Sequence, residues 1–330
     1  MRMSESILAV EALHGKIKER VEQLNYGENP HNLYEPMKYI MSLGGKRMRP
    51  LLVLLAYQLR GTNPDEILDA ALAVELFHNF TLMHDDIMDE APIRRGKPTV
   101  HEKWNQTVAI LSGDAMLVKV YDHLLKVPPP LLSESILNFN RTAVEVCEGQ
   151  QIDMNFEELA EVSEKEYLEM IRLKTAVLLG FSMQFGGILS GSDAANSQRL
   201  YEIGERMGLG FQLMDDFLDV YADKAKFGKQ VGGDIIANKK TYLLISALEM
   251  ANEEQRKNLT KWLKYEGENL DEKVEAVKNI YDEIGVPNLA KLKMNYYFDQ
   301  AFDLLEKVEG SQEAKDVFKN YASSLAKREK

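Results

Sequence analysis

The stretch Leu82-Met83-His84-Asp85-Asp86-Ile87-Met88-Asp89 places three aspartates in apolar sequence, and Leu213-Met214-Asp215-Asp216-Phe217-Leu218-Asp219 repeats the pattern about 130 residues later. Both motifs read D-D-x-x-D. On a helix, the first and last aspartates of each motif fall one turn apart on the same face. Carboxylates held so close in desolvating surroundings repel each other unless a cation lies between them. Carboxylate oxygens suit Mg²⁺, which also binds water and phosphate oxygens. The two motifs therefore predict magnesium sites.

Helical spacing of apolar residues extends along nearly the whole chain, and neither half shows strand-like alternation. The expected helices lie at residues 4–24, 35–43, 51–59, 65–89, 100–122, 138–156, 164–189 and 195–221, and the helical pattern resumes from 241 to 330. The clearest break is Val127-Pro128-Pro129-Pro130. Because the two acidic motifs need each other and lie on opposite sides of this break, we expect one all-α domain over residues 1–330.

Composition and charge exclude several classes of function. The net charge of −12 makes nucleic acid an improbable partner for the chain. One cysteine, Cys147, excludes an internal disulfide and fits a reducing cytoplasm, and we expect its side chain to be buried. Residues 1–10 carry no secretory signal, and residues 175–192 are too polar and glycine-rich for a membrane span. We therefore expect a cytoplasmic protein without a transmembrane segment.

Basic residues form separate clusters, each beside a turn, a glycine or a polar break. They are Lys46 and Arg49, Arg94 and Arg95, Lys174, and Lys229 and Lys239. The first cluster follows Gly44-Gly45 and precedes Pro50, at a predicted helix N-terminus that favours an anion. His78 lies seven residues before Asp85 and so shares its helix face. The polar, glycine-containing residues 221–238 predict a mobile loop over the site.

Taken in order, these motifs resemble the trans-isoprenyl (polyprenyl) diphosphate synthases of the short-chain type. The resemblance extends from about residue 30 to 250. It rests on Gly44-Gly45-Lys46-x-x-Arg49, the first D-D-x-x-D with Arg94-Arg95-Gly96-Lys97-Pro98-Thr99, Lys174-Thr175, Phe211-Gln212-x-x-Asp215-Asp216-x-x-Asp219, and Gly228-Lys229 with Gly233-Asp234 and Lys239.

The resemblance implies a helical bundle of the isoprenoid synthase type with a central active-site cavity, usually as a homodimer. It implies a prenyltransferase that joins isopentenyl diphosphate head-to-tail to an allylic diphosphate (dimethylallyl, geranyl or farnesyl), with three Mg²⁺ ions per site. Mg²⁺ and nearby cations stabilise the departing diphosphate, so that the allylic C–O bond ionises in a water-poor pocket. Isopentenyl diphosphate attacks the carbocation and then loses a proton.

The resemblance also assigns roles to residues. Isopentenyl diphosphate is expected at Lys46, Arg49, His78 and Arg95, and the allylic diphosphate at Arg94, Lys174, Lys229 and Lys239. The expected metal ligands are Asp85, Asp89, Asp215 and Asp219. Asp219 ranks lower among them, and Asp86 and Asp216 rank lower too, as outer or water-bridging carboxylates. The carbocation is expected beside Lys174, Thr175 and Gln212, so the catalytic residues are these three together with Asp85 and Asp215.

Product length in the family depends on the side chains just before the first acidic motif. Phe80 is the fifth residue before Asp85 and Thr81 the fourth, a combination that resembles geranylgeranyl synthases. By helical geometry Thr81 and Phe77 lie near the face of Asp85, so Phe77 is a candidate floor of the tunnel beside or instead of Phe80. We expect twenty-carbon geranylgeranyl diphosphate, with fifteen-carbon farnesyl diphosphate as the close alternative.

Two alternative functions remain open at the level of sequence. A class I terpene cyclase also ionises an allylic diphosphate, but it usually has a different second metal motif and no second diphosphate site. A non-catalytic subunit of a homologous synthase commonly loses an acidic motif, and both motifs are intact here. One departure from some relatives is the C-terminus, Lys327-Arg328-Glu329-Lys330, where an acidic residue interrupts the cations that close the isopentenyl site.

Overall fold

A computed structural model describes residues 3–61, 63–222 and 232–326. Contacts within the chain divide it into two compact units. Unit 1 comprises Met1–Asn140, Phe181–Tyr201 and Val308–Tyr321, and unit 2 comprises Arg141–Gly180, Glu202–Lys307 and Ala322–Lys330. The first acidic motif belongs to unit 1 and the second to unit 2.

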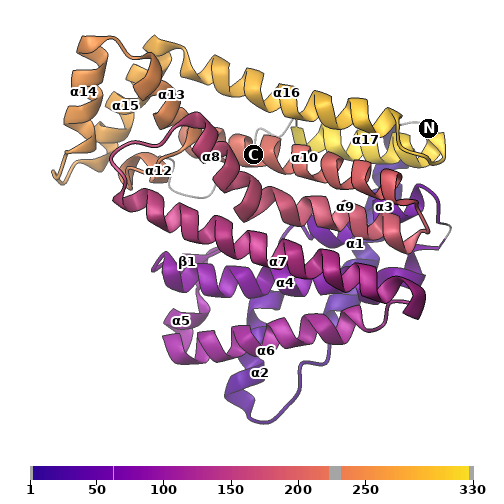
Figure 1. Ribbon diagram of the computed structural model, residues 1–330. Helices are drawn as coiled ribbons and strands as arrows, with labels where there is room; N and C mark the ends of the chain where they lie inside the picture. Colours follow the sequence, from indigo (N-terminus) through magenta and orange to yellow (C-terminus); the bar gives the residue numbers. More distant parts are fainter. Residues whose placement is uncertain (1–2, 62, 223–231, 327–330) are drawn as a thin grey trace. The chain divides into compact units, whose positions relative to one another are not determined.

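The first part of unit 1 is helical apart from one short hairpin (Figure 1). Its elements are α1 (Met3–Glu22), α2 (His31–Ser42), α3 (Met48–Gln58), η1 (Pro64–Ile67), α4 (Leu68–Met88), β1 (Ile93–Arg94), β2 (Lys97–Pro98), α5 (Val100–Lys103) and α6 (Gln106–Leu124). The helices α7 (Pro129–Glu158), α9 (Val177–Leu189), α10 (Ala194–Tyr221) and α17 (Gln312–Ala326) contribute residues to both units.

Unit 2 contains the remaining helices. They are α8 (Glu164–Ile171), the π-helical turn η2 (Arg172–Ala176), α12 (Gly233–Ile236), α13 (Tyr242–Met250), α14 (Glu253–Leu263), α15 (Leu270–Ile284) and α16 (Val286–Glu306). Among them, α15 lies against α12, α13, α14 and α16. Its core is a cluster of buried side chains that includes Leu213, Leu243, Val277 and Tyr281.

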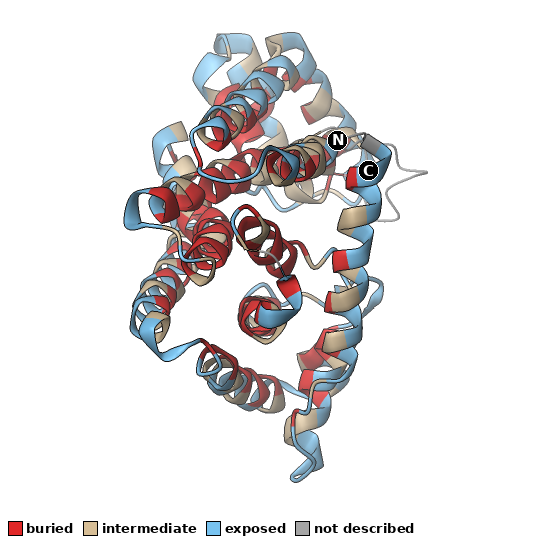
Figure 2. Cartoon of the chain, turned by 90° about the vertical axis from the view of Figure 1, so that its right-hand side faces the viewer, coloured by how far each residue is buried: buried red, intermediate tan, exposed pale blue. Residues whose placement is uncertain are grey.

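The core of unit 1 is built on α3 and α4, which pack against each other. Almost every residue of α3 is buried, and so are all residues of α4 from 70 to 77. A helix that is apolar all round has no face for water, so it is surrounded by other elements, and α4 packs along α6 as well. Figure 2 shows the difference between helices buried around most of their circumference and those with an exposed side. The first acidic motif thus ends a helix that is fully buried from residue 70 to 77.

Several local expectations from the sequence are wrong. The helix expected at residues 100–122 is interrupted, because α5 ends at Lys103 and α6 begins at Gln106. The proline run does not delay the next helix to residue 138, because α7 begins at Pro129. Proline suits the first turn of a helix, where no backbone N–H is needed. The segment after the first acidic motif is a two-stranded antiparallel hairpin rather than an irregular loop. Its turn residues Arg95 and Gly96 both have positive φ, of 53° and 74°, as a tight two-residue hairpin turn requires.

The predicted all-α fold is confirmed, because the two strands of the described chain contain only two residues each. Within the described ranges, no helix is both long and apolar enough to cross a membrane. The expected burial of Cys147 is wrong: its thiol lies on the exposed side of α7. The position of Cys147 on α7, where buried and exposed residues alternate, sets its exposure. The residue type alone does not determine whether a cysteine is buried.

Candidate active site

The first acidic motif lies at the C-terminal end of α4. Asp85 is half-buried, Asp86 is buried and Asp89 is exposed at the end of the helix. The Nε of Arg94 donates to both carboxylate oxygens of Asp86, at 2.8 and 2.9 Å. A second guanidinium nitrogen lies 3.7 Å from Asp85. Burial raises the pKa of Asp86, although the hydrogen bonds from Arg94 oppose this. Asp86 therefore positions Arg94, and Asp85 and Asp89 are the metal-ligand candidates.

The hairpin and the Gly44-Gly45 loop come together. The guanidinium of Arg95 donates to the carbonyl of Gly44. At Gly45, whose φ is 121°, a Cβ would lie 2.5 Å from that guanidinium. Burial lowers the pKa of Arg95, and the neighbouring Arg47 adds to the effect. The positive φ is what requires a glycine here. The hydrogen bond places the guanidinium of Arg95 against the loop that carries Lys46, so two predicted ligands of isopentenyl diphosphate belong to neighbouring segments.

A buried ion pair beneath this loop was not predicted from the sequence. Arg47 has a φ of 44° at the N-terminus of α3 and donates to the carboxylate of Glu75 and the carbonyl of Met41. Asn79 donates to the same carboxylate at 2.9 Å. A signal exists in the sequence, since Glu75 interrupts the apolar run of α4 and a buried carboxylate must be paired. The pair fixes the loop that carries Lys46 and the first turn of α3, which carries Arg49.

His78 is half-buried among cations. Burial lowers its pKa well below the ordinary value, and Arg49, Arg95, Arg94 and Arg47 lower it further, in that order. The imidazole is therefore neutral at pH 7, and it offers one donor and one acceptor. Three of the residues predicted to bind diphosphates thus gather with His78 in an otherwise acidic chain.

The three predicted chain-length residues point to different partners. Phe77 is 1% exposed and packs edge-on against Phe139, with ring centroids 5.1 Å apart. Phe80 packs edge-on against His84 at 4.8 Å. The hydroxyl of Thr81 donates to the carbonyl of His78 at 2.8 Å, within its own helix. Phe77 therefore belongs to the aromatic core of unit 1, and the ring of Phe80 also contacts that of Phe77, with centroids 5.7 Å apart.

In unit 2 the second motif lies near the C-terminal end of α10. Asp215 is exposed, Asp216 is buried and Asp219 is half-buried. Asp216 accepts hydrogen bonds from the hydroxyl of Tyr167, from Gln212 at 3.3 Å and from the backbone N–H of Tyr242 at 3.3 Å. Burial raises the pKa of Asp216 to about 6 against these hydrogen bonds. The carboxylate of the middle aspartate is thus again held by partners within the protein.

Lys174 and Thr175 lie in the π-helical turn η2. Such turns are rare and are frequent at functional sites. The ammonium of Lys174 is 2.6 Å from the carboxylate of Asp153 on α7, and the hydroxyl of Thr175 donates to the amide oxygen of Gln212 at 3.2 Å. Gly149 of α7 lies so close that a Cβ there would be 2.1 Å from the backbone nitrogen of Lys174. Three predicted catalytic side chains are thus neighbours, and Asp153 is a partner that sequence reasoning missed.

The segment after the second motif folds back onto Asp219. A carboxylate oxygen of Asp219 accepts from the N–H of Asp234 at 2.9 Å, and the N–H of Lys239 donates to the carbonyl of Asp234 at 2.9 Å. Burial, followed by Asp219 and Asp216, raises the pKa of Asp234 to about 7. Lys229 lies outside the described residues, and so do half of the predicted mobile loop (223–231) and the C-terminal residues 327–330.

The donors present fit Mg²⁺ bound together with a diphosphate. Asp85 and Asp89 form one pair of candidate ligands and Asp215 and Asp219 the other, all with hard oxygen donors. In the described part of the chain, no three His, Cys, Asp or Glu side chains come close enough to hold a metal by themselves. Mg²⁺ typically binds one or two carboxylates and completes its shell with water and substrate phosphates. Each pair, taken by itself, is therefore compatible with a metal ion whose remaining positions water and substrate fill.

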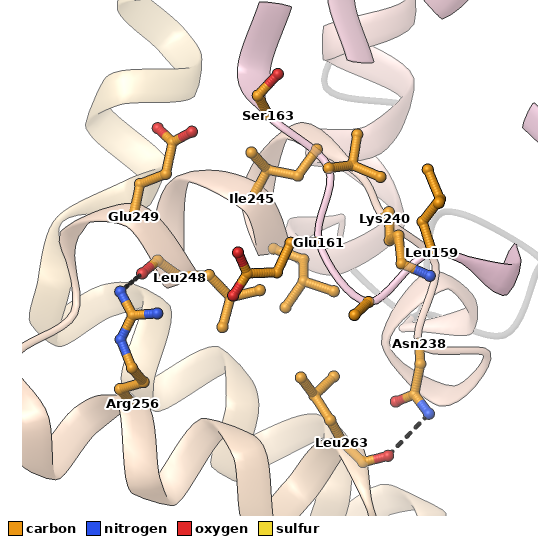
Figure 3. A pocket seen from close by; sticks show the side chains of 13 residues that line it. Leu159, Glu161, Ser163, Asn238, Lys240, Ile245, Leu248, Glu249, Arg256 and Leu263 are labelled. Carbon is orange, nitrogen blue, oxygen red and sulfur yellow. Dashed lines mark hydrogen bonds between the residues drawn. The ribbon is translucent and has the colours of Figure 1, made fainter. Parts of the chain in front are cut away.

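A separate hollow of about 400 Å³ lies in unit 2, between the 159–163 segment, α13 and α14 (Figure 3). Two of its polar side chains donate hydrogen bonds within the protein. Arg256 donates to the carbonyl of Leu248, and Asn238 donates to the carbonyl of Leu263 at 2.9 Å. None of the predicted site residues lines this hollow, so it is not part of the candidate active site.

Comparison with known proteins identifies the class. A family model described as Polyprenyl synthetase matches residues 30–284. The chain therefore belongs to the polyprenyl synthetase family, and the predictions of an isoprenoid synthase fold and of a trans-prenyltransferase are confirmed.

Several similar proteins are named as geranylgeranyl diphosphate or pyrophosphate synthases. The chain is 36% identical to a geranylgeranyl pyrophosphate synthase of Geoglobus acetivorans, over 94% of each chain. It is 42% identical to a geranylgeranyl diphosphate synthase of Methanosarcina mazei, over 69% of this chain and 71% of that one. The solved geranylgeranyl pyrophosphate synthetase of Pyrococcus horikoshii is similar with a TM-score of 0.91 and 32% identity, over 98% and 99% of the two chains.

Proposed function

We propose that the chain condenses isopentenyl diphosphate with allylic diphosphates to give geranylgeranyl diphosphate. The observation that carries the proposal is the gathering of Arg49, Arg94 and Arg95 around His78, beside Asp85. Cations concentrated in a chain of net charge −12 are suited to hold an anionic substrate that a terpene cyclase does not need. The relatives named as geranylgeranyl diphosphate synthases support the same assignment.

The two diphosphates have separate sites in this proposal. Isopentenyl diphosphate is held by Lys46, Arg49, His78 and Arg95. The allylic diphosphate is held by Arg94, Lys174, Lys229 and Lys239, together with Mg²⁺ on Asp85, Asp89, Asp215 and Asp219. We propose three ions per site, and the metal supplies positive charge opposite the departing diphosphate.

The reaction starts with cleavage of the allylic C–O bond, whose electron pair leaves with the diphosphate. Lys174 and Lys239 stabilise the charge that develops on that group. The oxygens of Thr175 and Gln212, which lie 3.2 Å apart, present lone pairs to the allylic cation. The π electrons of isopentenyl diphosphate then form the new C–C bond, and the released diphosphate takes the proton. Asp153 and Asp86 orient Lys174 and Arg94 through ion pairs.

Product length depends on the floor of the tunnel below Asp85. Phe77 lies about 12 Å along the helix from Asp85, by a rise of 1.5 Å per residue over eight residues. The packing of Phe77 on Phe139 supports Phe77 as the floor, and Phe80 adjoins it, because the rings of Phe77 and Phe80 are 5.7 Å apart. We propose a twenty-carbon main product, and farnesyl diphosphate is the alternative that the assay below tests.

The chain is proposed to act as one domain in a cytoplasmic homodimer. The path of the chain passes between the two units within α7, α9, α10 and α17, which supports a single functional domain. Leu111, Val118 and Leu125 are 55%, 64% and 60% exposed. Because they are spaced by seven residues, they form one apolar stripe along α6. Such a stripe supports pairing with a second copy, which sedimentation of the purified protein tests.

The experiment that tests the function uses purified protein, Mg²⁺, radiolabelled isopentenyl diphosphate and each allylic primer in turn, with product length measured by chromatography. We expect geranylgeranyl diphosphate, and we expect Asp85→Ala and Asp215→Ala to lower turnover by several orders of magnitude without unfolding the protein. Asp303→Ala, at an exposed site on α16, is the matched control. Cyclic hydrocarbons would indicate a cyclase, and full folding without turnover would indicate a non-catalytic subunit.

A further inference from the structure

Lys273 of α15 is an unusual residue for the interior of unit 2, because it is only 2% exposed. Lysine is almost never fully buried unless it is paired, since removing an ammonium group from water is costly. Its neighbours on the same side of α15, Val274 and Val277, are apolar core residues. The hydrogen bonds of Lys273 therefore have to offset the cost of its burial.

Both described hydrogen bonds of the Lys273 ammonium go to one short segment. The Nζ donates to the carbonyl of Ile236 at 3.1 Å and to the side-chain oxygen of Asn238 at 2.7 Å. Ile236 is the last residue of α12, where helical carbonyls lack partners within the helix. A lysine that donates to such a carbonyl stabilises the end of a helix. Lys273 thus attaches the end of α12 to α15.

Asn238 continues this attachment. Its φ is 52°, a left-handed conformation in which asparagine is more common than most residues. Its side-chain nitrogen donates to the carbonyl of Leu263 at the end of α14, at 2.9 Å (Figure 3). The side-chain nitrogen of Asn238 therefore connects residues 236–238 to α14, and its side-chain oxygen connects them to Lys273 of α15.

The residue that follows is Lys239, which the proposed function places at the allylic diphosphate. Its N–H donates to the carbonyl of Asp234 and its carbonyl accepts from the N–H of Thr241, both at 2.9 Å. At the other end of the segment, Gly232 donates to the backbone carbonyl of Asp219 at 2.7 Å. The backbone around Lys239 is thus held at one end by the second acidic motif and at the other by Lys273 and Asn238.

We infer that Lys273, acting through Asn238, is a positioning residue that fixes Lys239 for the allylic diphosphate. The inference rests on the proposed role of Lys239. It adds the hydrogen bonds by which Lys273 of α15 holds Ile236 and Asn238, just before Lys239. Lys273 itself touches no substrate. Its removal therefore weakens binding of the allylic substrate and leaves binding of isopentenyl diphosphate unchanged.

The test measures steady-state kinetics for both substrates, together with thermal unfolding. Lys273→Met keeps the aliphatic stem and removes the ammonium, and Asn238→Gly removes the bridge while tolerating the positive φ. For each variant we expect KM for the allylic substrate to rise about tenfold, as the loss of one hydrogen bond to a charged group implies. The double variant should be no worse than the poorer single variant, because both changes break one bridge. Lys257→Met, at an exposed site on α14, is the matched control and should change neither KM.

The outcomes separate this inference from the proposed function. If Lys239→Ala leaves allylic kinetics unchanged, the role proposed for Lys239 is wrong. If Lys239→Ala raises the allylic KM but Lys273→Met and Asn238→Gly do not, the positioning role of Lys273 is wrong. An equal rise in both KM values, or additive effects in the double variant, would also overturn it. Asn238 is exposed, so Asn238→Gly keeps the test decisive even if Lys273→Met does not fold.

Discussion

Gly149→Ala tests whether the close approach of α7 to the π-helical turn positions the catalytic residues. A Cβ at position 149 would lie 2.1 Å from the backbone nitrogen of Lys174 and 2.6 Å from its Cα. Ordinary contact begins at 3.4 Å, so the two backbones must separate by about 1.3 Å at this point. The obstacle is backbone rather than the end of a flexible side chain, and a rotamer change cannot relieve it.

The displacement acts directly on Lys174 and Thr175. A misplacement of about 1 Å can cost on the order of a hundredfold in rate, so we expect kcat to fall by about that factor. Overpacking should also reduce the free energy of unfolding by about 1–3 kcal/mol. The assay is steady-state condensation with both substrates saturating, which gives kcat, accompanied by thermal unfolding. The 2.6 Å ion pair of Lys174 with Asp153 should be disturbed as well, because the two backbones carry its partners.

Gly15→Ala is the matched control. Gly15 lies within α1, and a Cβ there meets nothing within 4 Å. Alanine should therefore stabilise this helix by up to about 1 kcal/mol and leave kcat unchanged. A Gly149→Ala enzyme with wild-type kcat would refute the argument that the close approach sets the geometry of Lys174 and Thr175. Equal losses in the two variants would attribute the effect to general instability.

Three further predictions concern pH, substrate binding and product length. Burial raises the pKa of Asp234 to about 7, so the folded chain keeps a proton that the unfolded chain releases, and this stability is lost as pH rises from about 4 to 7. Without metal, Asp234→Asn should therefore gain melting temperature relative to wild type across that range, and a constant difference would contradict the shift. Lys46→Ala should raise KM for isopentenyl diphosphate more than for the allylic primer; the reverse order would exchange the two proposed sites. Phe77→Ala should lengthen the product on chromatography and Thr81→Phe should shorten it, whereas unchanged products in both would assign the floor to another helix.

Much of the fold is visible in the sequence because helices follow from local periodicity. The first helix was expected at residues 4–24 and is found at Met3–Glu22, and the helix expected at 195–221 is found at Ala194–Tyr221. Where prolines or a hairpin were involved, the expectation was wrong. Pro129 begins a helix instead of delaying one, and Arg95 lies in a hairpin turn that only two strand residues on each side support. Short elements carry too little pattern to be recognised.

The candidate site was predicted in its residue types but not in its pairings. The motifs identified Arg94, Lys174 and the first and last aspartates of each D-D-x-x-D as candidates, because charges in apolar sequence require an explanation. They gave no indication that Arg94 pairs with Asp86 or that Lys174 pairs with Asp153. Such partners come from other segments of the chain, and no sequence spacing brings them together.

The sequence by itself determined the helical class, the two acidic motifs and the family, since each depends on the order of residues along the chain. Tertiary structure decided how each charge is used. Burial turned the middle aspartates, Asp86 and Asp216, into structural partners with raised pKa values, and it left Asp85 half-buried and Asp215 exposed. It also placed Lys273 in the core, where it binds the segment before Lys239. The physical reason is that the energy of a charge depends on its solvent exposure and on its nearest partners, and both are set by packing between distant segments.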